Sequence, residues 1–296
     1  MIEKLKKLKV GKVVSNPKMS DYTTYKVGGN ALAIIYPTDI NSLIELLKYL
    51  DKNNIKHKIL GNGSNLIFTD DLYDGVLIKL DEFNKLEIND TIVTVGAGYN
   101  LVKLSIKLSK LGLSGLEFAA GIPGTVGGAV FMNAGAYKSD MGYIVSEAKV
   151  LTPDYQVITL YNKNLDFHYR TSFLQKHPGY ICLEAKLVLK HGDVNKIMEI
   201  IADRKQRRLL TQPLEYPSAG SVFRNPENDF AGRLIEELGY KGKNIGGAYV
   251  SEKHANFIIN KNNATASDVR NLIKEIKEKV KEKYNIDLVV EQEFVD

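Results

Sequence analysis

Residues 115–137 read GLEFAAGIPGTVGGAVFMNAGAY, and glycine recurs there at positions 121, 124, 127, 128 and 135. Glycine at this density weakens any helix or strand, so tight backbone geometry should matter more in this segment than residue propensity. Glycine also lets backbone N–H groups approach an anion closely, and Pro123 stiffens the chain beside it. A second loop of this kind, Gly61-Asn62-Gly63-Ser64-Asn65, lies upstream. The two loops predict a large bound dinucleotide.

The surroundings of the upstream loop exclude the two common nucleotide motifs. We expect strands at 57–60 and 66–68, so this loop joins strand to strand. A Rossmann fingerprint needs three glycines between a strand and a helix, and the third glycine is missing here. A Walker A motif occurs nowhere in the chain.

The hydrophobic pattern predicts a mixed α+β chain. The prolines at 213 and 217 end a helix and mark the best candidate domain boundary. Ahead of that boundary we expect helices at 38–52, 100–111 and 194–210, and strands at 33–36, 76–80, 91–98, 148–151, 157–160 and 182–189. Beyond it we expect helices at 230–238 and 266–284 and strands at 255–259 and 288–295.

Composition limits the class of protein. A chain of 296 residues with 44% hydrophobic and 25% charged residues is long enough for two domains with separate cores. The net charge of +5 is spread along helices, which does not indicate nucleic-acid binding. Cys182 is the only cysteine and should be a buried, inert thiol.

Localisation and metal binding follow from the same composition. No apolar run approaches the roughly 20 residues of a membrane span, and no apolar signal core follows the basic N-terminus, so we expect a cytoplasmic protein without a membrane partner. The five histidines form no metal-binding pair, and we expect no metal.

Three polar positions could carry chemistry. Arg170, in Tyr169-Arg170-Thr171-Ser172, is either a surface residue or a fork for a carboxylate. Ser221 lies among small residues without a nearby histidine, which disfavours a Ser-His-Asp hydrolase but leaves an ordinary turn serine or a proton donor. Glu291 and Glu293 should share one face of the last strand, facing either solvent or a site.

In this order along the chain, these segments resemble the UDP-N-acetylenolpyruvoylglucosamine reductase (MurB) family, in its shorter variant without an extra tyrosine-bearing loop. The resemblance covers nearly the whole chain. The segments that carry it are Tyr25-Lys26-Val27-Gly28-Gly29, Gly61–Asn65, the glycine segment, Tyr169–Ser172, Gln212–Pro217, Gly220-Ser221-Val222-Phe223, Ile245-Gly246-Gly247-Ala248 and Glu291.

The resemblance implies an α+β fold in two parts. Residues 1–200 would form an FAD-binding domain of the vanillyl-alcohol-oxidase or PCMH type, and residues 201–296 a smaller substrate-binding domain. FAD would be held noncovalently by the two glycine loops. The implied cofactor contacts are Gly61, Asn62, Gly63, Ser64, Asn65, Gly121, Ile122, Pro123, Gly124, Thr125, Gly127, Gly128 and Ala129.

The implied reaction reduces the enolpyruvyl group of UDP-N-acetylglucosamine-enolpyruvate with NADPH through FAD, in peptidoglycan precursor synthesis. Arg170 would support negative charge on the substrate carboxylate, Ser221 would protonate the α-carbon, and Glu291 would be the acidic partner near the carboxylate. The UDP-sugar would be held by Tyr137, Arg208, Asn225 and His254.

Some alternatives stay open. Gln292 and Glu293 stand where a valine and a basic residue are common in the family, so Glu293 could replace Glu291 as the acid. Thr211 stands where some relatives have a lysine. A flavin oxidase or dehydrogenase with the same FAD domain is a second enzyme class, and a catalytically silent nucleotide-sugar-binding protein is a third possibility.

Overall fold

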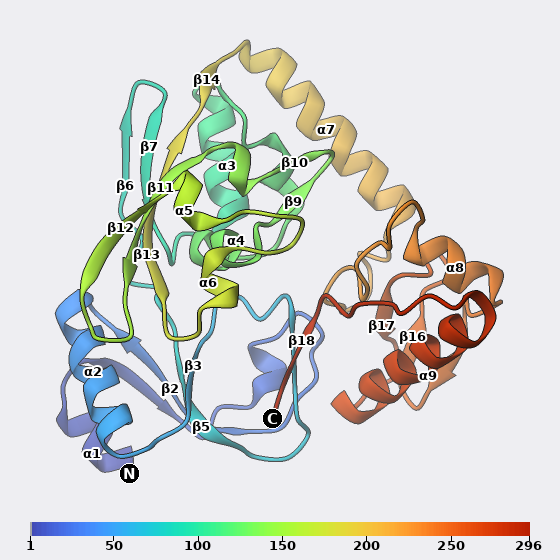
Figure 1. Cartoon of the computed structure of the whole chain (residues 1–296), viewed down its shortest axis with the longest axis horizontal. Helices are drawn as coiled ribbons and strands as arrows, with labels where there is room; N and C mark the ends of the chain where they lie inside the picture. The colour runs from blue at the N-terminus through green and yellow to red at the C-terminus, as the bar shows by residue number, and fades with distance from the viewer. Residues whose placement is uncertain (1) are drawn as a thin grey trace. The chain divides into compact units, whose positions relative to one another are not determined.

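The computed structural model describes residues 2–296, which form two compact units (Figure 1). The first unit contains residues 2–15, 33–62 and 75–205. The second contains residues 16–32, 63–74 and 206–296. Each unit has its own hydrophobic core.

The first unit begins with a small mixed sheet in the order β1-β2-β5-β3. Strand β1 is antiparallel to β2, and β3 is parallel to β5. Asp39 caps the following helix, because its Oδ1 accepts a hydrogen bond from Ser42 N at 2.8 Å. The bounds are α1 Ile2–Lys7, β1 Gly11–Ser15, β2 Ala31–Pro37, α2 Ile40–Lys52, β3 His57–Ile59 and β5 Tyr73–Ile78.

The same unit contains a larger antiparallel sheet in the order β12-β11-β13-β7-β6 (Figure 1). Helix α4 packs on β13 and β7, and the apolar face of α3 is buried through Leu101, Leu104 and Leu108. The bounds are β6 Leu86–Asn89, β7 Ile92–Gly96, α3 Leu101–Lys110, β8 Leu113–Ser114, α4 Val126–Met132, β9 Gly135–Ala136, β10 Ser139–Asp140, β11 Val145–Leu151, β12 Val157–Tyr161, α5 Asn162–Leu165, α6 Phe173–Lys176, β13 Ile181–Val188 and β14 Lys190–His191.

The second unit packs helices against a three-stranded antiparallel sheet, β15-β16-β17 (Figure 1). Helix α9 lies against β15 and β16 and begins with a capping box formed by Thr265 and Asp268. The C-terminal strand β18 pairs in parallel with β4. The bounds are β4 Leu66–Phe68, α8 Ala231–Glu237, β15 Asn244–Ile245, β16 Ala248–Val250, β17 Ile258–Asn260, α9 Ala266–Tyr284 and β18 Glu293–Val295.

Short 3₁₀ helices and one long helix complete the chain. Helix α7, Val194–Thr211, ends just before Gln212-Pro213, as the proline predicts. The 3₁₀ helices are η1 Met19–Asp21, η2 Glu117–Gly121 and η3 Met141–Tyr143.

The structure corrects two expectations about local structure. The glycine segment contains a helix, α4, because Thr125 caps its first turn and accepts from Gly128 N at 3.3 Å. The expected strand at 288–295 is shortened to β18, since the chain bends at Gln292. Glu291 therefore lies outside the strand that contains Glu293. The alternation expected to place both on one face is interrupted.

A single boundary between residues 200 and 201 does not describe the two compact units. Tyr25, Val27 and Ile67 belong to the core of the second unit, so segments from the N-terminal part of the chain fold with the C-terminal residues. The assignment of FAD binding to 1–200 and substrate binding to 201–296 stays a prediction. Among residues 2–296, no helix is long and apolar enough to cross a membrane.

Candidate active site

The first residues of the upstream loop contact the glycine segment. A Cβ atom at Gly61 would lie 3.0 Å from Thr125 Oγ1, so a side chain there would crowd the threonine. Lys79 Nζ donates to the carbonyl oxygen of Gly61 at 2.9 Å, and the lysine is only 8% exposed. The two loops predicted to hold one dinucleotide thus meet at Gly61 and Thr125. Lys79 Nζ also lies 3.3 Å from Asp81 Oδ1, so the charge of the lysine is paired within the chain.

The remainder of the loop belongs to the second unit. Gly63 has φ of +61°, and a Cβ atom there would lie 2.1 Å from the carbonyl oxygen of Tyr22. Only glycine combines this left-handed backbone with so close an approach. Asn65 Nδ2 donates to the carbonyl oxygen of Glu291 at 3.0 Å, and Asn65 O accepts from Glu293 N at 2.9 Å. Asn65 therefore holds the chain on both sides of Gln292.

The glycines of the downstream segment allow close packing. Gly127 N donates to Ala97 O at 2.8 Å, and a Cβ atom on Gly127 would lie 2.8 Å from Ala97 Cβ. Val126 N donates to Tyr99 O at 2.9 Å. Together with Gly128 N, these amides donate within the chain, so the first turn of α4 is fixed against the end of β7.

The residues before α4 form a tight connection. Gly121 ends the 3₁₀ helix η2, and Ile122 N donates to Ala119 O at 3.0 Å. Gly124 O accepts from Leu101 N at 3.0 Å. Pro123 thus lies between two residues, Ile122 and Gly124, whose backbones are hydrogen-bonded. Ala129, further along in α4, is buried.

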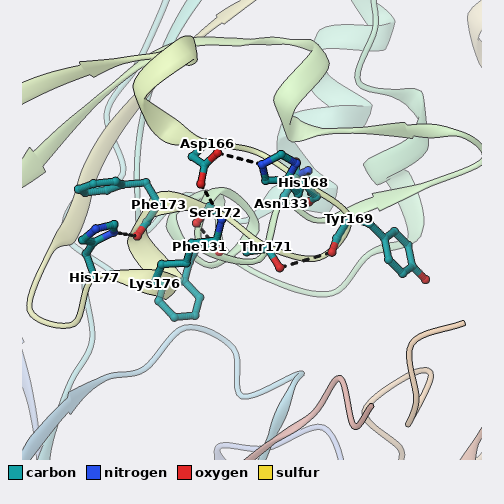
Figure 2. Close-up of polar contacts among 10 residues, drawn as sticks. All are labelled: Phe131, Asn133, Asp166, His168, Tyr169, Thr171, Ser172, Phe173, Lys176 and His177. Atoms are coloured by element: carbon teal, nitrogen blue, oxygen red, sulfur yellow. Dashed lines mark hydrogen bonds and ion pairs between the residues drawn. The ribbon is translucent and has the colours of Figure 1, made fainter. Parts of the chain in front are cut away.

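Asn133 ends α4 and links the glycine segment to the loop that carries Arg170. Its backbone is left-handed, with φ of +43°. Its Nδ2 donates to His168 O at 2.8 Å (Figure 2). Its Oδ1 accepts from Gly142 N at 2.9 Å. One side chain thus holds two loops that are distant in the sequence.

Arg170 is also held by the end of the glycine segment. It also has a left-handed backbone, with φ of +54°, and its Nη2 donates to Gly135 O at 2.6 Å. Its guanidinium carbon lies 5.0 Å from the centre of the Tyr169 ring. Ser172 is fully buried, and its hydroxyl donates to Phe131 O at 2.7 Å, as Figure 2 shows. These contacts tie the predicted arginine loop to the end of the glycine segment.

Tyr137 lies at the far end of the glycine segment and contacts helix α7. Its hydroxyl donates to Arg204 O at 3.1 Å, and the guanidinium carbon of Arg204 lies 4.6 Å from its ring centre. The ring remains 41% exposed. Arg208, on the part of α7 that belongs to the second unit, donates through Nε to Gln212 Oε1 at 2.9 Å.

The second unit brings Ser221 and Glu291 into neighbouring segments. Glu291 N donates to the carbonyl oxygen of Val222 at 2.8 Å, and Phe223 forms a bridge with Val290. On its other side Ser221 forms a bridge with Phe257. The turn that carries Ser221 is therefore held between the C-terminal segment and the segment before β17.

Asn225 and His254 meet at the first turn of α8. Asn225 Oδ1 accepts from Ala231 N at 3.1 Å, and a Cβ atom on Gly232 would lie 3.3 Å from His254 Cε1. His254 Nδ1 accepts from Asn256 N at 3.1 Å, which places a proton on Nε2 of the neutral ring.

The surroundings of His254 favour this neutral form. Burial lowers the pKa of His254, and the nearby positive charge of Lys241 lowers it further, while Glu236 opposes both. The ring also lies 4.9 Å from the ring of Phe257, centre to centre. His254 is therefore a hydrogen-bond donor through Nε2 rather than a cation.

Sequence reasoning missed residues that hold the site segments together. Lys79 holds Gly61, and Asn133 holds the arginine loop. Asn256 and Gln292 hold the serine turn. All four side chains are buried. Lys79, Asn133 and Asn256 each stand in a mostly apolar stretch, which is the signal that could have singled them out, whereas Gln292 lies between two glutamates and gives no such signal. Among residues 2–296, no group of three or more histidine, cysteine or acidic residues could hold a metal ion.

Two families match the chain. Residues 31–161 match the family described as FAD binding domain. Residues 212–295 match the family described as UDP-N-acetylenolpyruvoylglucosamine reductase, C-terminal domain. The first match contains Gly61 and all of the glycine segment, and the second contains Ser221 and Glu291.

Curated relatives match over the full length. The UDP-N-acetylenolpyruvoylglucosamine reductase of Bacillus licheniformis is 48% identical over 100% of this chain and 98% of that protein. The Bacillus subtilis protein of the same name is 46% identical over the same shares. The solved structure of UDP-N-acetylenolpyruvylglucosamine reductase (MurB) from Thermus caldophilus matches with a TM-score of 0.81 and 34% identity, over 96% of this chain and 98% of that one.

These matches confirm the resemblance and the α+β fold with its FAD-binding domain. Because the identity extends over the full length, both glycine loops and the serine turn lie within the part of the chain that matches this one family. The chain belongs to the UDP-N-acetylenolpyruvoylglucosamine reductase family.

Proposed function

We propose that this protein reduces UDP-N-acetylglucosamine-enolpyruvate to UDP-N-acetylmuramate with NADPH, using noncovalently bound FAD, in the cytoplasm. The observation that carries the proposal is the arrangement of the second unit, which places Ser221 and Glu291 on segments joined by the Glu291 N to Val222 O hydrogen bond. The overall change adds a hydride and a proton across the carbon–carbon double bond of the enolpyruvyl group.

The residues around Gly61 fit FAD. The close approach of Gly61 to Thr125, with Lys79 donating to Gly61 O, brings the two glycine loops together, as a pyrophosphate held by both loops requires. We assign cofactor binding to the predicted residues of both loops, from Gly61 to Asn65 and from Gly121 to Ala129 without Val126. When bound, FAD supplies hydride transfer from NADPH to the substrate.

Arg170 supports negative charge in this proposal. Addition of hydride to the vinyl carbon builds negative charge toward the substrate carboxylate, and a guanidinium stabilises such charge with two parallel N–H donors. The contacts with Gly135 O and the Tyr169 ring hold the arginine side chain before substrate arrives. Because the side chain is already held in place, little reorganisation is needed when the negative charge develops.

Ser221 donates the proton in this proposal. The serine lies in a turn held on both sides, which suits a proton donor that must be aimed at one carbon atom. Positioned proton transfer of this kind is typically worth about 10²- to 10⁴-fold in rate. Protonation of the α-carbon completes the lactyl ether.

Glu291 is favoured over Glu293 as the acidic partner. Glu291 N hydrogen-bonds to the residue after Ser221, whereas Glu293 N hydrogen-bonds to Asn65 and Glu293 lies in β18 beside β4. We assign the UDP-sugar to Tyr137, Arg208, Asn225 and His254. The neutral His254 offers an Nε2–H donor for a sugar or phosphate oxygen.

An anaerobic titration of the purified protein tests this function. We expect a yellow protein that NADPH bleaches and that recovers its colour on addition of UDP-N-acetylglucosamine-enolpyruvate without oxygen. Recovery only when air is admitted would indicate a flavin oxidase. A colourless protein that cannot be reconstituted with FAD would leave only a nucleotide-sugar-binding role.

A further inference from the structure

We propose that Gln292 is a positioning residue for Ser221, because its buried side-chain amide holds the backbone turn that carries the serine hydroxyl. The inference rests on the proposed function and deepens it, since it names a residue that acts through the proton donor. Three observations support this role: the contacts of Gln292, the geometry of the turn, and the buried partner Tyr25.

The side chain of Gln292 is 4% exposed and makes four contacts. Its Nε2 lies 3.1 Å from Ala219 O and 3.4 Å from the carbonyl oxygens of Gly220 and Ser221. Its Oε1 accepts from the hydroxyl of Tyr25 at 3.2 Å. Carbonyl oxygens only accept hydrogen bonds, so the NH₂ group must face the turn and the orientation of the amide is determined.

The turn needs such a support because its backbone is not part of a regular strand. Gly220 has a left-handed φ of +74°, and a Cβ atom there would meet nothing within 4 Å. The requirement for glycine at this position is therefore conformational and not steric. The two N–H donors of the amide, shared among three consecutive carbonyl oxygens, keep the backbone in this conformation up to Ser221.

The residues after Ser221 have their own clamp. Asn256 Oδ1 accepts from Phe223 N at 3.0 Å, and Asn256 Nδ2 donates to Phe223 O at 2.8 Å. Val222 N donates to Asn256 O at 2.9 Å. Gln292 holds the residues up to Ser221, and Asn256 holds those that follow. The serine lies where the two clamps meet.

Tyr25 anchors Gln292 from the interior of the same unit. It is fully buried, and burial raises the pKa of its hydroxyl, which stays protonated and available as a donor. Asn260 Nδ2 also donates to the carbonyl oxygen of Tyr25 at 3.1 Å. Tyr25 is thus fixed on two sides, so the hydrogen bond from its hydroxyl restricts the position of the Gln292 amide.

The test separates the two half-reactions by anaerobic stopped-flow in the FAD-loaded protein. Gln292→Met keeps the length of the side chain and removes its hydrogen bonds. We expect flavin reduction by NADPH to be unchanged and reoxidation by UDP-N-acetylglucosamine-enolpyruvate to slow about 10- to 100-fold, the loss expected from a small misplacement of a reacting group. Tyr25→Phe should slow reoxidation less, because the amide keeps its contacts with the turn. Val289→Thr, an exposed neighbour, is the matched control and should behave as the native protein.

A double variant shows whether Gln292 acts through Ser221. Gln292→Met should cause no further loss when Ser221 is already alanine, because residues that act as a unit are not additive. Native reoxidation in both Gln292→Met and Tyr25→Phe, equal losses in the two half-reactions, or losses that multiply in the double variant would overturn the inference. Native reoxidation in Ser221→Ala alone would instead overturn the role of Ser221 in the proposed function. If Gln292→Met does not fold, Tyr25→Phe provides the test, and it should slow reoxidation while flavin reduction by NADPH stays at the native rate.

Discussion

Glu291 donates its backbone N–H to the carbonyl oxygen of Val222 at 2.8 Å, which joins the end of the chain to the turn that carries Ser221. Asn65 Nδ2 donates to the carbonyl oxygen of the same glutamate at 3.0 Å. Residues from three distant parts of the sequence therefore meet in the second unit. Hydrogen bonds thus join the segment of the proposed acid both to the turn of the proposed proton donor and to the end of the upstream glycine loop.

Asn133 should stabilise the first unit in two separable ways. Asn133→Gly removes the side-chain bonds to His168 O and Gly142 N and should lower the free energy of unfolding by about 1–3 kcal/mol. Asn133→Ala should cost about 1–2 kcal/mol more, because alanine resists the left-handed backbone. Denaturant unfolding of both variants measures the difference. Equal stability of the two variants would show that the backbone conformation carries no cost.

His254 should make stability depend on pH between its folded and unfolded pKa values. Burial lowers the folded pKa below the ordinary value of 6.5, so the unfolded chain binds the proton more readily. The contribution is complete above about pH 6.5 and is lost as the pH falls toward the lowered folded value. Unfolding of the native protein and of His254→Gln across this interval should show a shallower slope in the variant. Parallel slopes would contradict the assignment.

Cys182 should be unreactive in the folded protein. Its side chain is 6% exposed, and burial raises the pKa of the thiol to about 12. Because the thiolate is the nucleophile, we expect slow reaction with an aromatic disulfide reagent at pH 8 and rapid, complete reaction after denaturation. Reaction of the native protein at the rate of a free thiol would show that this strand opens.

Local patterns in the sequence predicted the regular elements well. The apolar stripe of α9 gives its bounds correctly, and the cap at Asp39 and the stop at Pro213 behave as their chemistry requires. Burial of Cys182 was also predicted and is confirmed. Such features depend on neighbours in the chain, which the sequence displays directly.

Long-range contacts were harder to predict. The contact of Gly61 with Thr125 and the hydrogen bonds of Gln292 depend on tertiary packing, which no local pattern encodes. Gln292 looked like a departure from the family pattern, and the structure shows it to be a buried support. The helix α4 was missed because Thr125 and the packing of Gly127 on Ala97 outweigh the poor helix propensity of glycine.

Anaerobic stopped-flow of Ser221→Ala tests the central claim most directly. Flavin reduction by NADPH should match that of the native protein, since the serine donates its proton only after hydride reaches the substrate. Reoxidation by UDP-N-acetylglucosamine-enolpyruvate should slow about 10²- to 10⁴-fold, the usual contribution of positioned proton transfer. Native rates in both half-reactions would contradict the assignment of Ser221 as the proton donor.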